Sequence, residues 1–353
     1  MSEEDPVHEV KRRARPRGPR PTLKDVARVA GVSPRTVSRV FNREPRISDR
    51  TRKHVLEVVE ELGFRPNLMA RNMRVGARDA AVGLVIPDLA NPFFGTVASG
   101  VEKVIRTRGL NLVIASSDED AEREQSVVNT LLERQVMALM VVPSAGSDHR
   151  YLRAERKHGL PIVFLDRPPD GLPCDVVLTA NFDGAARAVA HLVGHGHRRI
   201  GFLGDVPAAL YTRRERYRGY CHALEQAGVE LDEGLVDHGH HEGDAAEATR
   251  RLLAQERPPT AMFAANNLAC MGVIIALTRA QRRDVALVGF DDFTLADAFE
   301  PGTSVVAQDA ERLGTTAADL VLARIDGDHG DPRTVVLPTE LISRGSGELS
   351  PIA

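Results

Sequence analysis

From residue 80 onward, short apolar runs alternate with longer stretches of mixed polarity. Mostly apolar runs of this length are typical of strands buried on both faces of a parallel sheet. The stretches between them are long enough for crossover helices. This rhythm predicts an α/β fold made of two doubly wound parallel-sheet lobes. The strand-like runs are AAVGLVIP, NLVIAS, VMALMVV, PIVFLD, RRIGFLG, TAMFAA and VALVGF, and a further run, TSVVA, comes just before Gln308.

The preceding segment has a helical period instead. Thr22 can cap a first helix, and Asp25, three residues later, completes a capping box. Gly31 is placed to end that helix. The apolar residues at helical spacing are Leu23, Val26, Ala27 and Ala30. A short amphipathic helix is therefore expected after Thr22.

A second helix is predicted only one residue further on. Ser33 is a good N-cap and Pro34 suits the first helical position. Val37, Val40 and Phe41 supply its apolar face. Two helices joined by so short a turn predict a helix-turn-helix.

A third helix is expected after Ser48, ending near Gly63. Its inward-facing residues are Val55, Val58, Val59 and Leu62. Together the three helices predict a small all-α domain ahead of the two lobes.

Charge is divided unevenly along the 353 residues. The chain carries 46 Lys+Arg and 49 Asp+Glu, a net charge of −3. Residues 1–76 hold 18 basic and 10 acidic residues, a net of +8, which leaves a net of −11 on the remainder. A basic head on an acidic body favours binding of the head to a polyanion. Charge alone leaves a solvated tail as the alternative, and residues 1–21, rich in Arg, Pro and Gly, are expected to form a disordered arm.

If the second helix enters a major groove, its first turn contacts the bases. The exposed residues there are Pro34, Arg35, Thr36 and Arg39. We expect Arg35 to make a bidentate guanine contact, whereas Arg39, Ser38 and backbone amides near Ser33 suit phosphates. Which arginine contacts a base is open at this stage, and a helix-turn-helix pattern can also be a fragment of a larger helical core.

Residues 65–78, RPNLMARNMRVGAR, are too short for a stable isolated helix. A helix capped by Asn67 and running to Arg74 would place Ala70 and Met73 on one side. Arg71 and Arg74 would then be available for phosphates, and an apolar Met between arginines suits a minor-groove wedge. The alternative is a plain interdomain linker.

The runs TLKDVARVAGVSPRTVSRVFN (22–42), SDRTR (48–52) and PNLMARNMR (66–74) resemble the LacI/GalR, or lac repressor, family of transcriptional regulators. The resemblance spans nearly all of residues 22–346. It implies a ligand-responsive repressor that binds a palindromic operator in double-stranded DNA as a homodimer. It also implies a hinge helix that folds on DNA and inserts an apolar lever, here Met73 where Leu is usual. Tetrameric relatives carry an added C-terminal heptad helix, and this chain ends RGSGELSPIA, which favours a dimer.

The resemblance also sets the expected domains and further DNA contacts. The domains are the arm 1–21, the helix-turn-helix 22–65, the hinge 66–78, the effector-binding and dimerisation domain 79–346 and the tail 347–353. The additional DNA contacts are Thr22, Asn42, Arg46, Ser48 and Thr51.

A binding cleft is expected where the two lobes face each other, because parallel-sheet lobes bind ligands outside the carboxyl ends of their strands. Carboxylates, amides, arginines and aromatic rings at those positions suit a neutral sugar. The candidates are Asn91, Phe93, Phe94, Asp166, Arg167, Arg216, Asn266, Asp291 and Gln308. Their segments also resemble cleft motifs of periplasmic sugar-binding proteins, particularly the ribose-binding type. At the position where those clefts usually have an aromatic side chain in the wall, this sequence has His241.

Other chemistry finds little support in the residues. His238, His240 and His241 match no standard metal spacing, so a solvated loop is expected and no metal or cofactor. No P-loop, G-x-S-x-G elbow or Rossmann fingerprint is present, so the chain is not expected to be an enzyme. The competing class is a solute- or sugar-binding protein without a DNA role. A carbohydrate kinase or isomerase is a third possibility.

Composition indicates a compartment. No apolar run approaches the roughly 18 residues of a membrane span, and the acidic first ten residues differ from a signal peptide. Three widely spaced cysteines, Cys174, Cys221 and Cys270, fit neither a disulfide framework nor a zinc site. A cytoplasmic protein without membrane contact is expected.

Overall fold

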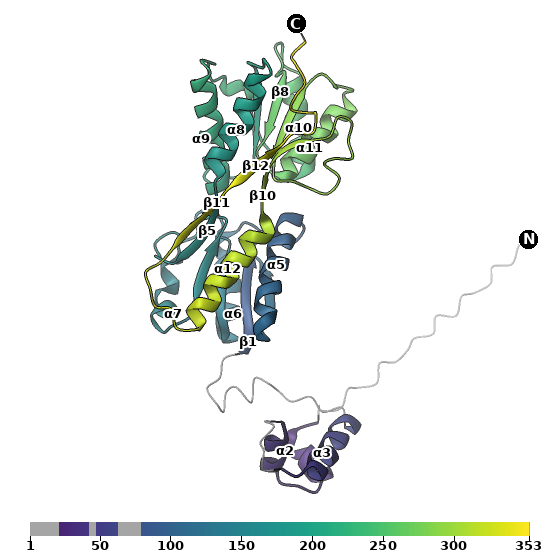
Figure 1. Cartoon of the computed structure of the whole chain (residues 1–353), viewed down its shortest axis with the longest axis vertical. Coiled ribbons are helices and arrows are strands. Elements are labelled where there is room, and N and C mark those ends of the chain that lie inside the picture. Colours follow the sequence, from purple (N-terminus) through teal and green to yellow (C-terminus); the bar gives the residue numbers. More distant parts are fainter. Residues whose placement is uncertain (1–20, 42–46, 63–78, 353) are drawn as a thin grey trace, which may run out of the picture. The chain divides into compact units, whose positions relative to one another are not determined.

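The computed structural model describes residues 21–41, 47–62 and 79–352 (Figure 1). The chain divides into two compact units, Met1–Ala77 and Arg78–Ala353. Apart from Pro21, the arm expected over 1–21 lies outside the described residues, and so does the hinge helix expected over 66–78. Within the described ranges, no helix has both the length and the apolar character needed to cross a bilayer.

The first unit contains the three predicted helices, α1 (Leu23–Val29), α2 (Pro34–Phe41) and α3 (Asp49–Glu61). Their predicted caps are confirmed. Thr22 and Asp25 form a capping box, Ser33 Oγ accepts from the Thr36 amide at 3.0 Å, and Ser48 caps α3. Gly31 follows α1 with a φ of +63°, a backbone conformation that favours glycine.

A small apolar core joins these helices. Its buried members come from all three, and they are Val26, Ala27, Ala30, Val37, Val40, Val55 and Val58. Leu23, Phe41, Val59 and Leu62 are partly buried against it. The helical spacing in the sequence therefore identified the inward faces correctly.

The second unit consists of two lobes, each with a six-stranded sheet. The N-lobe sheet is parallel, in the order β11-β5-β4-β3-β1-β2. The C-lobe sheet has the order β12-β10-β9-β8-β6-β7 and is parallel except for its antiparallel β12 edge. The strands are β1 (Asp79–Ile86), β2 (Asn111–Ser116), β3 (Val136–Val141), β4 (Ile162–Leu165), β5 (Asp175–Thr179), β6 (Ile200–Gly204), β7 (Val236–His238), β8 (Ala261–Ala264), β9 (Ala286–Phe290), β10 (Ser304–Gln308), β11 (Thr334–Leu337) and β12 (Thr339–Ile342).

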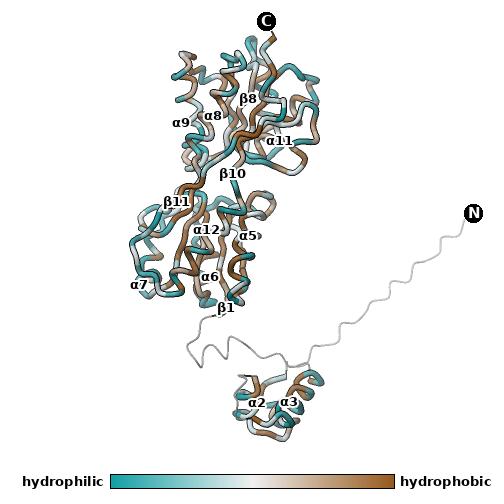
Figure 2. Tube along the Cα trace, in the orientation of Figure 1, coloured by the Kyte–Doolittle hydropathy of each residue, from teal (hydrophilic) through white to brown (hydrophobic). Residues whose placement is uncertain are grey.

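Helices cover both faces of each sheet, as the predicted doubly wound fold requires. In the N-lobe, α5 and α12 pack on one face and α6 on the other; in the C-lobe, α8 and α9 lie opposite α10 and α11. Hydrophobic residues run through the interior of both lobes, while outer loops are mostly hydrophilic (Figure 2). The helices are α5 (Pro92–Ile105), α6 (Ala121–Glu133), α7 (Arg153–Lys157), α8 (Asn181–Gly194), α9 (Tyr211–Gln226), α10 (Glu242–Leu253), α11 (Asn267–Arg279) and α12 (Ala310–Ile325), with 3-10 turns η1 (Arg106–Arg108), η2 (His149–Leu152) and η3 (Glu233–Leu235).

The chain passes between the lobes three times, which the apolar rhythm does not reveal. It leaves the N-lobe after β5, returns after β10 to form α12 and β11, and ends in the C-lobe with β12. The strands β5, β7, β11 and β12 were not predicted. Residues 310–337 thus complete the N-lobe although they follow the C-lobe in sequence.

Two glycines allow a close helix contact on the N-lobe. A Cβ at Gly100 of α5 would lie 2.3 Å from the Glu311 carbonyl oxygen of α12, and one at Gly314 would lie 2.1 Å from the Val97 oxygen. Neither position tolerates a side chain without movement of backbone. This contact fixes α12 against α5, and α12 begins just after Gln308, a predicted cleft residue.

Candidate effector cleft and DNA-binding helix

The first turn of α2 has the geometry expected of a recognition helix. Pro34 and Arg35 are exposed, whereas Val37 and Val40 are buried on the opposite side. Ser38 and Arg39 are half-buried. The Ser33 and Ser48 hydroxyls pair with Thr36 Oγ1 and Thr51 Oγ1 at 2.9 and 2.8 Å while they cap their helices. These four hydroxyl groups are thus partly engaged within the unit.

Several predicted DNA contacts cannot be placed. Asn42, Arg46, Asn67, Ala70, Arg71, Met73 and Arg74 lie outside the described residues. Thr22 lies in the described part, where its side chain closes the capping box of α1.

Most of the predicted effector-binding residues line one cavity between the two sheets. They approach it from the carboxyl ends of strands in both lobes, as the parallel topology requires. The cavity has a volume of about 50 Å³, well below the roughly 300–1,000 Å³ of typical ligand pockets. A ligand of sugar size therefore requires the lobes to separate. The predicted residues in it are Asn91, Phe93, Phe94, Asp166, Arg167, Arg216, Asn266, Asp291 and Gln308.

Arg167, directly after β4, is held from three sides. Its Nη1 and Nη2 donate to Glu119 Oε2 and Oε1 at 2.8 and 2.6 Å, and Nη1 also donates to the Pro143 carbonyl at 2.8 Å. Its Nε lies 3.4 Å from Asp166 Oδ2. The guanidinium is buried, and a bidentate carboxylate pair fixes its plane. Arg167 is thus oriented before any ligand arrives.

Arg216 and Asp291 form the corresponding pair in the C-lobe. Arg216 Nη1 lies 3.6 Å from Asp291 Oδ2, and its guanidinium stacks 3.7 Å above the Phe290 ring. Gln308 Nε2 donates to Asp291 Oδ1. Burial raises the pKa of Asp291, a shift that Arg216 and Gln308 partly oppose. These partners keep a buried carboxyl group available for hydrogen bonding.

Asp166 and Asp291 occupy equivalent positions in the two lobes. Each follows the last residue of a central strand, and each has a left-handed backbone, with φ of 63° and 72°. Such strain at non-glycine residues is found mostly at functional sites. Both carboxylates are aimed at the cleft in this way.

One wall of the cleft contains an acid–imidazole pair. His240 Nδ1 lies 2.9 Å from Asp205 Oδ1, and Asn266 Nδ2 donates to Asp205 Oδ2 at 3.1 Å. The hydrogen bond to Asp205 raises the pKa of His240, and the carboxylates of Glu119 and Asp88 add to the shift. Protonated His240 therefore balances part of the acidic charge in the cleft.

The expected cleft residue His241 is misplaced by one position. The structure puts His240 in the cavity, while His241 is exposed at the N-cap of α10, where its backbone amide donates to Asp244 Oδ2 at 3.4 Å. The loop before α10 ends with His241 as the N-cap residue of that helix. The similarity to cleft motifs does not reveal this local preference. Phe94 is mostly core, since it packs in the N-lobe interior, and Phe93 is the half-buried ring of the pair.

Several cleft residues were missed in the sequence. The strand-end rule that found the others also applies to Asp88, Glu119 and Asp205, which follow β1, β2 and β6. Asn267 and Arg213 also line the cavity, together with Thr212. These three lie within helices, as Arg216 does, and their distance from a strand end does not single them out.

Four buried polar atoms in the cleft make no hydrogen bond in the described part of the chain, although one of them, Arg167 Nε, lies within ion-pair distance of Asp166 Oδ2. They are Asp166 Oδ1, Arg167 Nε, Arg213 Nε and Gln308 Oε1. Two are acceptors and two are donors, and buried polar groups are nearly always satisfied. The cleft thus presents an unmatched mixture of donors and acceptors, as a site for a polyhydroxylated ligand would.

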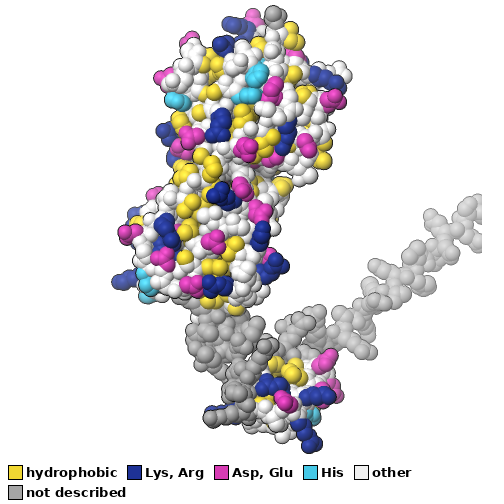
Figure 3. Space-filling model, in the orientation of Figure 1, with side chains coloured by type: hydrophobic (Ala, Val, Ile, Leu, Met, Phe, Trp, Pro, Cys, Tyr) yellow, Lys and Arg dark blue, Asp and Glu magenta, His cyan; other side chains and the backbone are white. Residues whose placement is uncertain are grey.

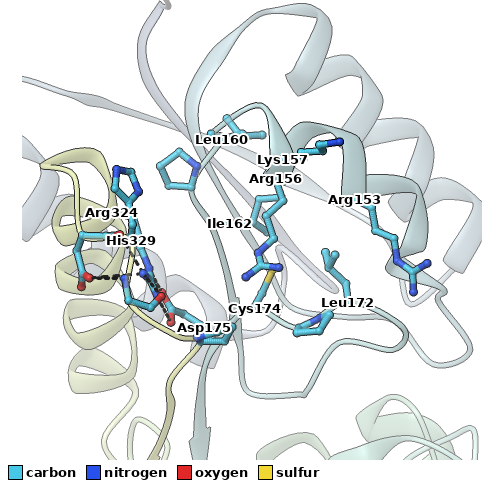
Figure 4. Close-up of a pocket in the computed structure, with 16 residues that line it drawn as sticks. Arg153, Arg156, Lys157, Leu160, Ile162, Leu172, Cys174, Asp175, Arg324 and His329 are labelled. Atoms are coloured by element: carbon cyan, nitrogen blue, oxygen red, sulfur yellow. Dashed lines mark hydrogen bonds and ion pairs between the residues drawn. The ribbon is translucent and has the colours of Figure 1, made fainter.

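A larger groove lies at the opposite edge of the N-lobe, with a volume of about 520 Å³ (Figure 4). Arg153, Arg156 and Lys157 of α7 line one wall, and Arg324 lies on the other. Arg324 donates to both carboxylate oxygens of Asp175, so this pair is internally satisfied. None of the predicted site residues lines the groove.

Charged side chains of both signs are interspersed over the face shown in Figure 3. Among the residues that the structure describes, no group of three or more His, Cys, Asp or Glu side chains could hold a metal ion. His240 and Asp205 contact each other in the cleft wall and form an ion pair when His240 is protonated.

Comparisons with known proteins agree with this architecture. Residues 22–67 match the family described as "Bacterial regulatory proteins, lacI family", and residues 189–347 match the "Periplasmic binding protein-like domain". The transcriptional repressor PurR of Mannheimia succiniciproducens is 31% identical, over 92% of this chain and 98% of its own length.

Solved structures match over the same length. The lac repressor dimer bound to operator and the anti-inducer ONPF is 27% identical, with a TM-score of 0.77, over 92% of this chain and 98% of its own. The complex of the regulator CelR with cellobiose is 32% identical, with a TM-score of 0.69, over 93% of this chain and 100% of its own. The resemblance noted in the sequence is confirmed: the chain belongs to the lacI family of bacterial regulatory proteins and is an effector-controlled, DNA-binding transcriptional regulator.

Proposed function

We propose that a neutral sugar bound in the cleft controls the affinity of this regulator for its operator. The observation that carries the proposal is the set of unpartnered donors and acceptors in the cavity, beside the half-buried ring of Phe93. Each sugar hydroxyl can donate to Asp166 or Gln308 oxygens and accept from Arg167 or Arg213 nitrogens. An aromatic ring suits the apolar face of the sugar. The similar CelR structure contains cellobiose.

The charges in the cleft favour a neutral ligand over a phosphorylated one. Five carboxylates line it, those of Asp88, Glu119, Asp166, Asp205 and Asp291. Three guanidinium groups and one imidazole oppose them, those of Arg167, Arg213, Arg216 and His240. Carboxyl groups therefore outnumber cationic groups even with His240 protonated, so the cleft has no surplus of positive charge for a phosphate group.

The site residues act in two groups. Asn91, Phe93, Asp166, Arg167, Arg216, His240, Asn266, Asp291 and Gln308 contact the effector, with Phe94 supporting the ring wall. In the head, Arg35 contacts a base, and Pro34, Thr36, Ser38 and Arg39 contact neighbouring bases or phosphates. Thr22, Ser33, Ser48 and Thr51 complete the phosphate contacts of the described part. Of the residues outside it, Arg71 and Arg74 contact phosphates and Met73 is the apolar lever in the minor groove, with Ala70 on the same side. Asn42, Arg46 and Asn67 are further DNA contacts.

The coupling between cleft and head runs through the arrangement of the lobes. A ligand that binds one arrangement more tightly increases its population. In a homodimer this changes how the paired segments 66–78 meet, and so whether they can fold against the minor groove. Induction corresponds to loss of this folding, and co-repression uses the same parts with the opposite sign. A palindromic operator calls for a homodimer, because a two-fold axis relates its half-sites.

The domains are assigned by these roles: the arm 1–21, the helix-turn-helix 22–65, the hinge 66–78, the effector-binding and dimerisation domain 79–346 and the tail 347–353. The protein acts on chromosomal DNA in the cytoplasm and is not an enzyme. A solute-binding protein would share the cleft, but the chain also contains α2 with its exposed Arg35, which such a protein has no use for.

The test uses the full chain in two steps. An operator is first selected from a random DNA library, and the Kd for it and for random DNA is measured at fixed salt. Thermal unfolding and operator binding are then followed with D-ribose, cellobiose and D-ribose 5-phosphate. We expect a neutral sugar to stabilise the protein, by about 2.7 kcal/mol at a hundred times its Kd, and to change the operator Kd. Stronger binding of the phosphate ester, or no response to any sugar, contradicts the proposal.

A further inference from the structure

A second group of polar side chains is buried in the N-lobe, behind the cleft. Glu124 of α6 and His149 of η2 are 0% and 1% exposed. His149 packs edge-on against Phe164, a member of the apolar core of the N-lobe, with 4.7 Å between the ring centroids. Burying ionisable groups is costly unless they are fully paired. Their partners therefore indicate what the group does.

Every polar atom of this pair is engaged. Glu124 Oε2 accepts from the Ser144 amide, and Glu124 Oε1 lies 3.0 Å from His149 Nε2. The Asp170 amide donates to His149 Nδ1 at 3.1 Å, so the ring proton must reside on Nε2. His149 then donates to Glu124. The tautomer of the imidazole is set by a backbone amide on one side and a carboxylate on the other.

These bonds tie together the three loops that follow β2, β3 and β4. Ser144 Oγ donates to Ser117 Oγ at 3.0 Å, which joins the loop after β3 to the loop after β2. The Glu124 carboxylate fastens the same β3 loop to α6. His149 and Asp170 join the β3 loop to the loop after β4 through two bonds, since the His149 amide also donates to the Asp170 carbonyl at 3.1 Å.

All three loops meet again at Arg167. Glu119, from the loop after β2, accepts hydrogen bonds from Nη1 and Nη2 of Arg167, and the Pro143 carbonyl, from the loop after β3, accepts a third from Nη1. Arg167 itself belongs to the loop after β4. The position of Arg167 in the cleft therefore depends on these three loops. The pair of Glu124 and His149 joins the same loops to one another.

The loop after β2 needs this support. Asp118 and Glu119 have consecutive left-handed backbones, with φ of 59° and 54°. Non-glycine residues hold such conformations only where the surrounding structure enforces them. Without the anchors behind it, this loop would relax and carry the Glu119 carboxylate away from Arg167.

We propose that Glu124 and His149 are positioning residues that hold Arg167 in its effector-binding orientation through the three loops. The inference rests on the proposed role of Arg167 in the cleft. It adds residues that lie behind the cavity and touch no ligand.

The variant Glu124→Gln tests this with little change in shape. Glu124 uses a different oxygen for Ser144 and for His149, and Gln has an NH2 donor in place of one of them. The Asp170 amide keeps His149 from reversing its tautomer. One of the loop links must therefore break. Glu122→Gln is the matched control, because Glu122 lies on the same helix, carries the same charge and is exposed.

The main measurement is the Kd for D-ribose in the full chain, in both native and Arg167→Ala backgrounds. Glu124→Gln should raise the Kd about tenfold in the native background and leave it nearly unchanged once Arg167 is absent. Glu122→Gln should have no effect in either. An equal increase in both backgrounds would overturn the proposal, because it would show that Glu124 acts on the lobe as a whole.

A second measurement needs no ligand and keeps this inference separate from the proposed function. In protein with ¹⁵N-labelled arginine, the Nε–H signal of Arg167 is identified by its loss in Arg167→Lys. Glu124→Gln should speed its hydrogen exchange about tenfold or more, and Glu122→Gln should not. Unchanged exchange rejects the positioning role even if ribose binds. Accelerated exchange supports it even if no sugar binds. Should Glu124→Gln fail to fold, His149→Asn replaces it with the same expected outcomes.

Discussion

Asn91 and Asn267 exchange amide contacts across the cleft between the lobes. Asn267 Nδ2 donates to Asn91 Oδ1 at 2.8 Å, and Asn91 Nδ2 donates to Asn267 Oδ1 at 3.4 Å. Asn91 also caps α5 by accepting from the Phe93 amide, so one side chain orders a helix start and bridges the lobes. The small cavity beside this pair shows that the lobes are close together here.

We predict that the Asn91–Asn267 pair stabilises the arrangement in which the two lobes lie close together. In urea unfolding, Asn91→Ala and Asn267→Ala should each destabilise the protein, and the double variant should be less harmful than their sum by about 0.5–1.5 kcal/mol. Strict additivity would show that the two amides do not interact in solution.

Arg35→Ala should weaken operator binding by about 1–3 kcal/mol and relax the preference at one base pair per half-site. The reason is the exposed position of Arg35 on the first turn of α2. Binding to the selected operator, to single-base variants of it and to random DNA is compared at constant salt. Equal weakening on all of these would assign Arg35 to a phosphate instead.

Asp291→Asn should raise the effector Kd about 10–100-fold, because a hydrogen bond to a charged group contributes about 1.5–3 kcal/mol. Operator affinity without effector should be unchanged, since Asp291 lies in a different compact unit from the head. Isothermal titration and gel shifts measure the two quantities. Arg250→Ala, a change on the exposed surface of α10, serves as the control. A normal response in Asp291→Asn would remove this carboxylate from the site.

Gly100→Ala should destabilise the second unit by about 1–3 kcal/mol, because its Cβ would meet the Glu311 carbonyl at 2.3 Å. Gly95→Ala in the same helix has no atom within 4 Å of the new Cβ and should stabilise by about 0.5–1 kcal/mol through its helix propensity. Chemical unfolding of both variants gives the comparison. A neutral Gly100→Ala would mean that α5 and α12 separate easily.

The His240–Asp205 pair predicts a specific pH dependence. Because the pKa of His240 is raised above its usual 6.5, its protonated form is favoured in the folded state. The resulting stability is fully present below pH 6.5 and is lost as the pH rises through the folded pKa. The stability difference between the native chain and His240→Asn should therefore shrink from pH 5.5 to pH 8.5, while other histidines cancel in the comparison. A constant difference would mean that the ion pair contributes nothing.

Local patterns in the sequence determined much of this protein. The caps at Thr22, Ser33 and Ser48 and the buried valines of the head follow from interactions within a few residues, so the helices could be predicted directly. Nine of the ten expected cleft residues line the cavity, and most of them come just after a strand, because parallel topology brings the strand ends to one edge.

Tertiary structure decided the rest. Short edge strands such as β7 and β11 have little apolar signal, and the return of residues 310–337 to the N-lobe depends on contacts with segments far away in sequence. His240 lies in the cavity in place of His241 because of the α10 cap. The link from Glu124 to Arg167 passes through the three loops after β2, β3 and β4. Periodicity reports which face of an element is buried, because that depends on near neighbours along the chain. It does not report which distant group is buried beside it, because packing and hydrogen-bond satisfaction in three dimensions determine that choice.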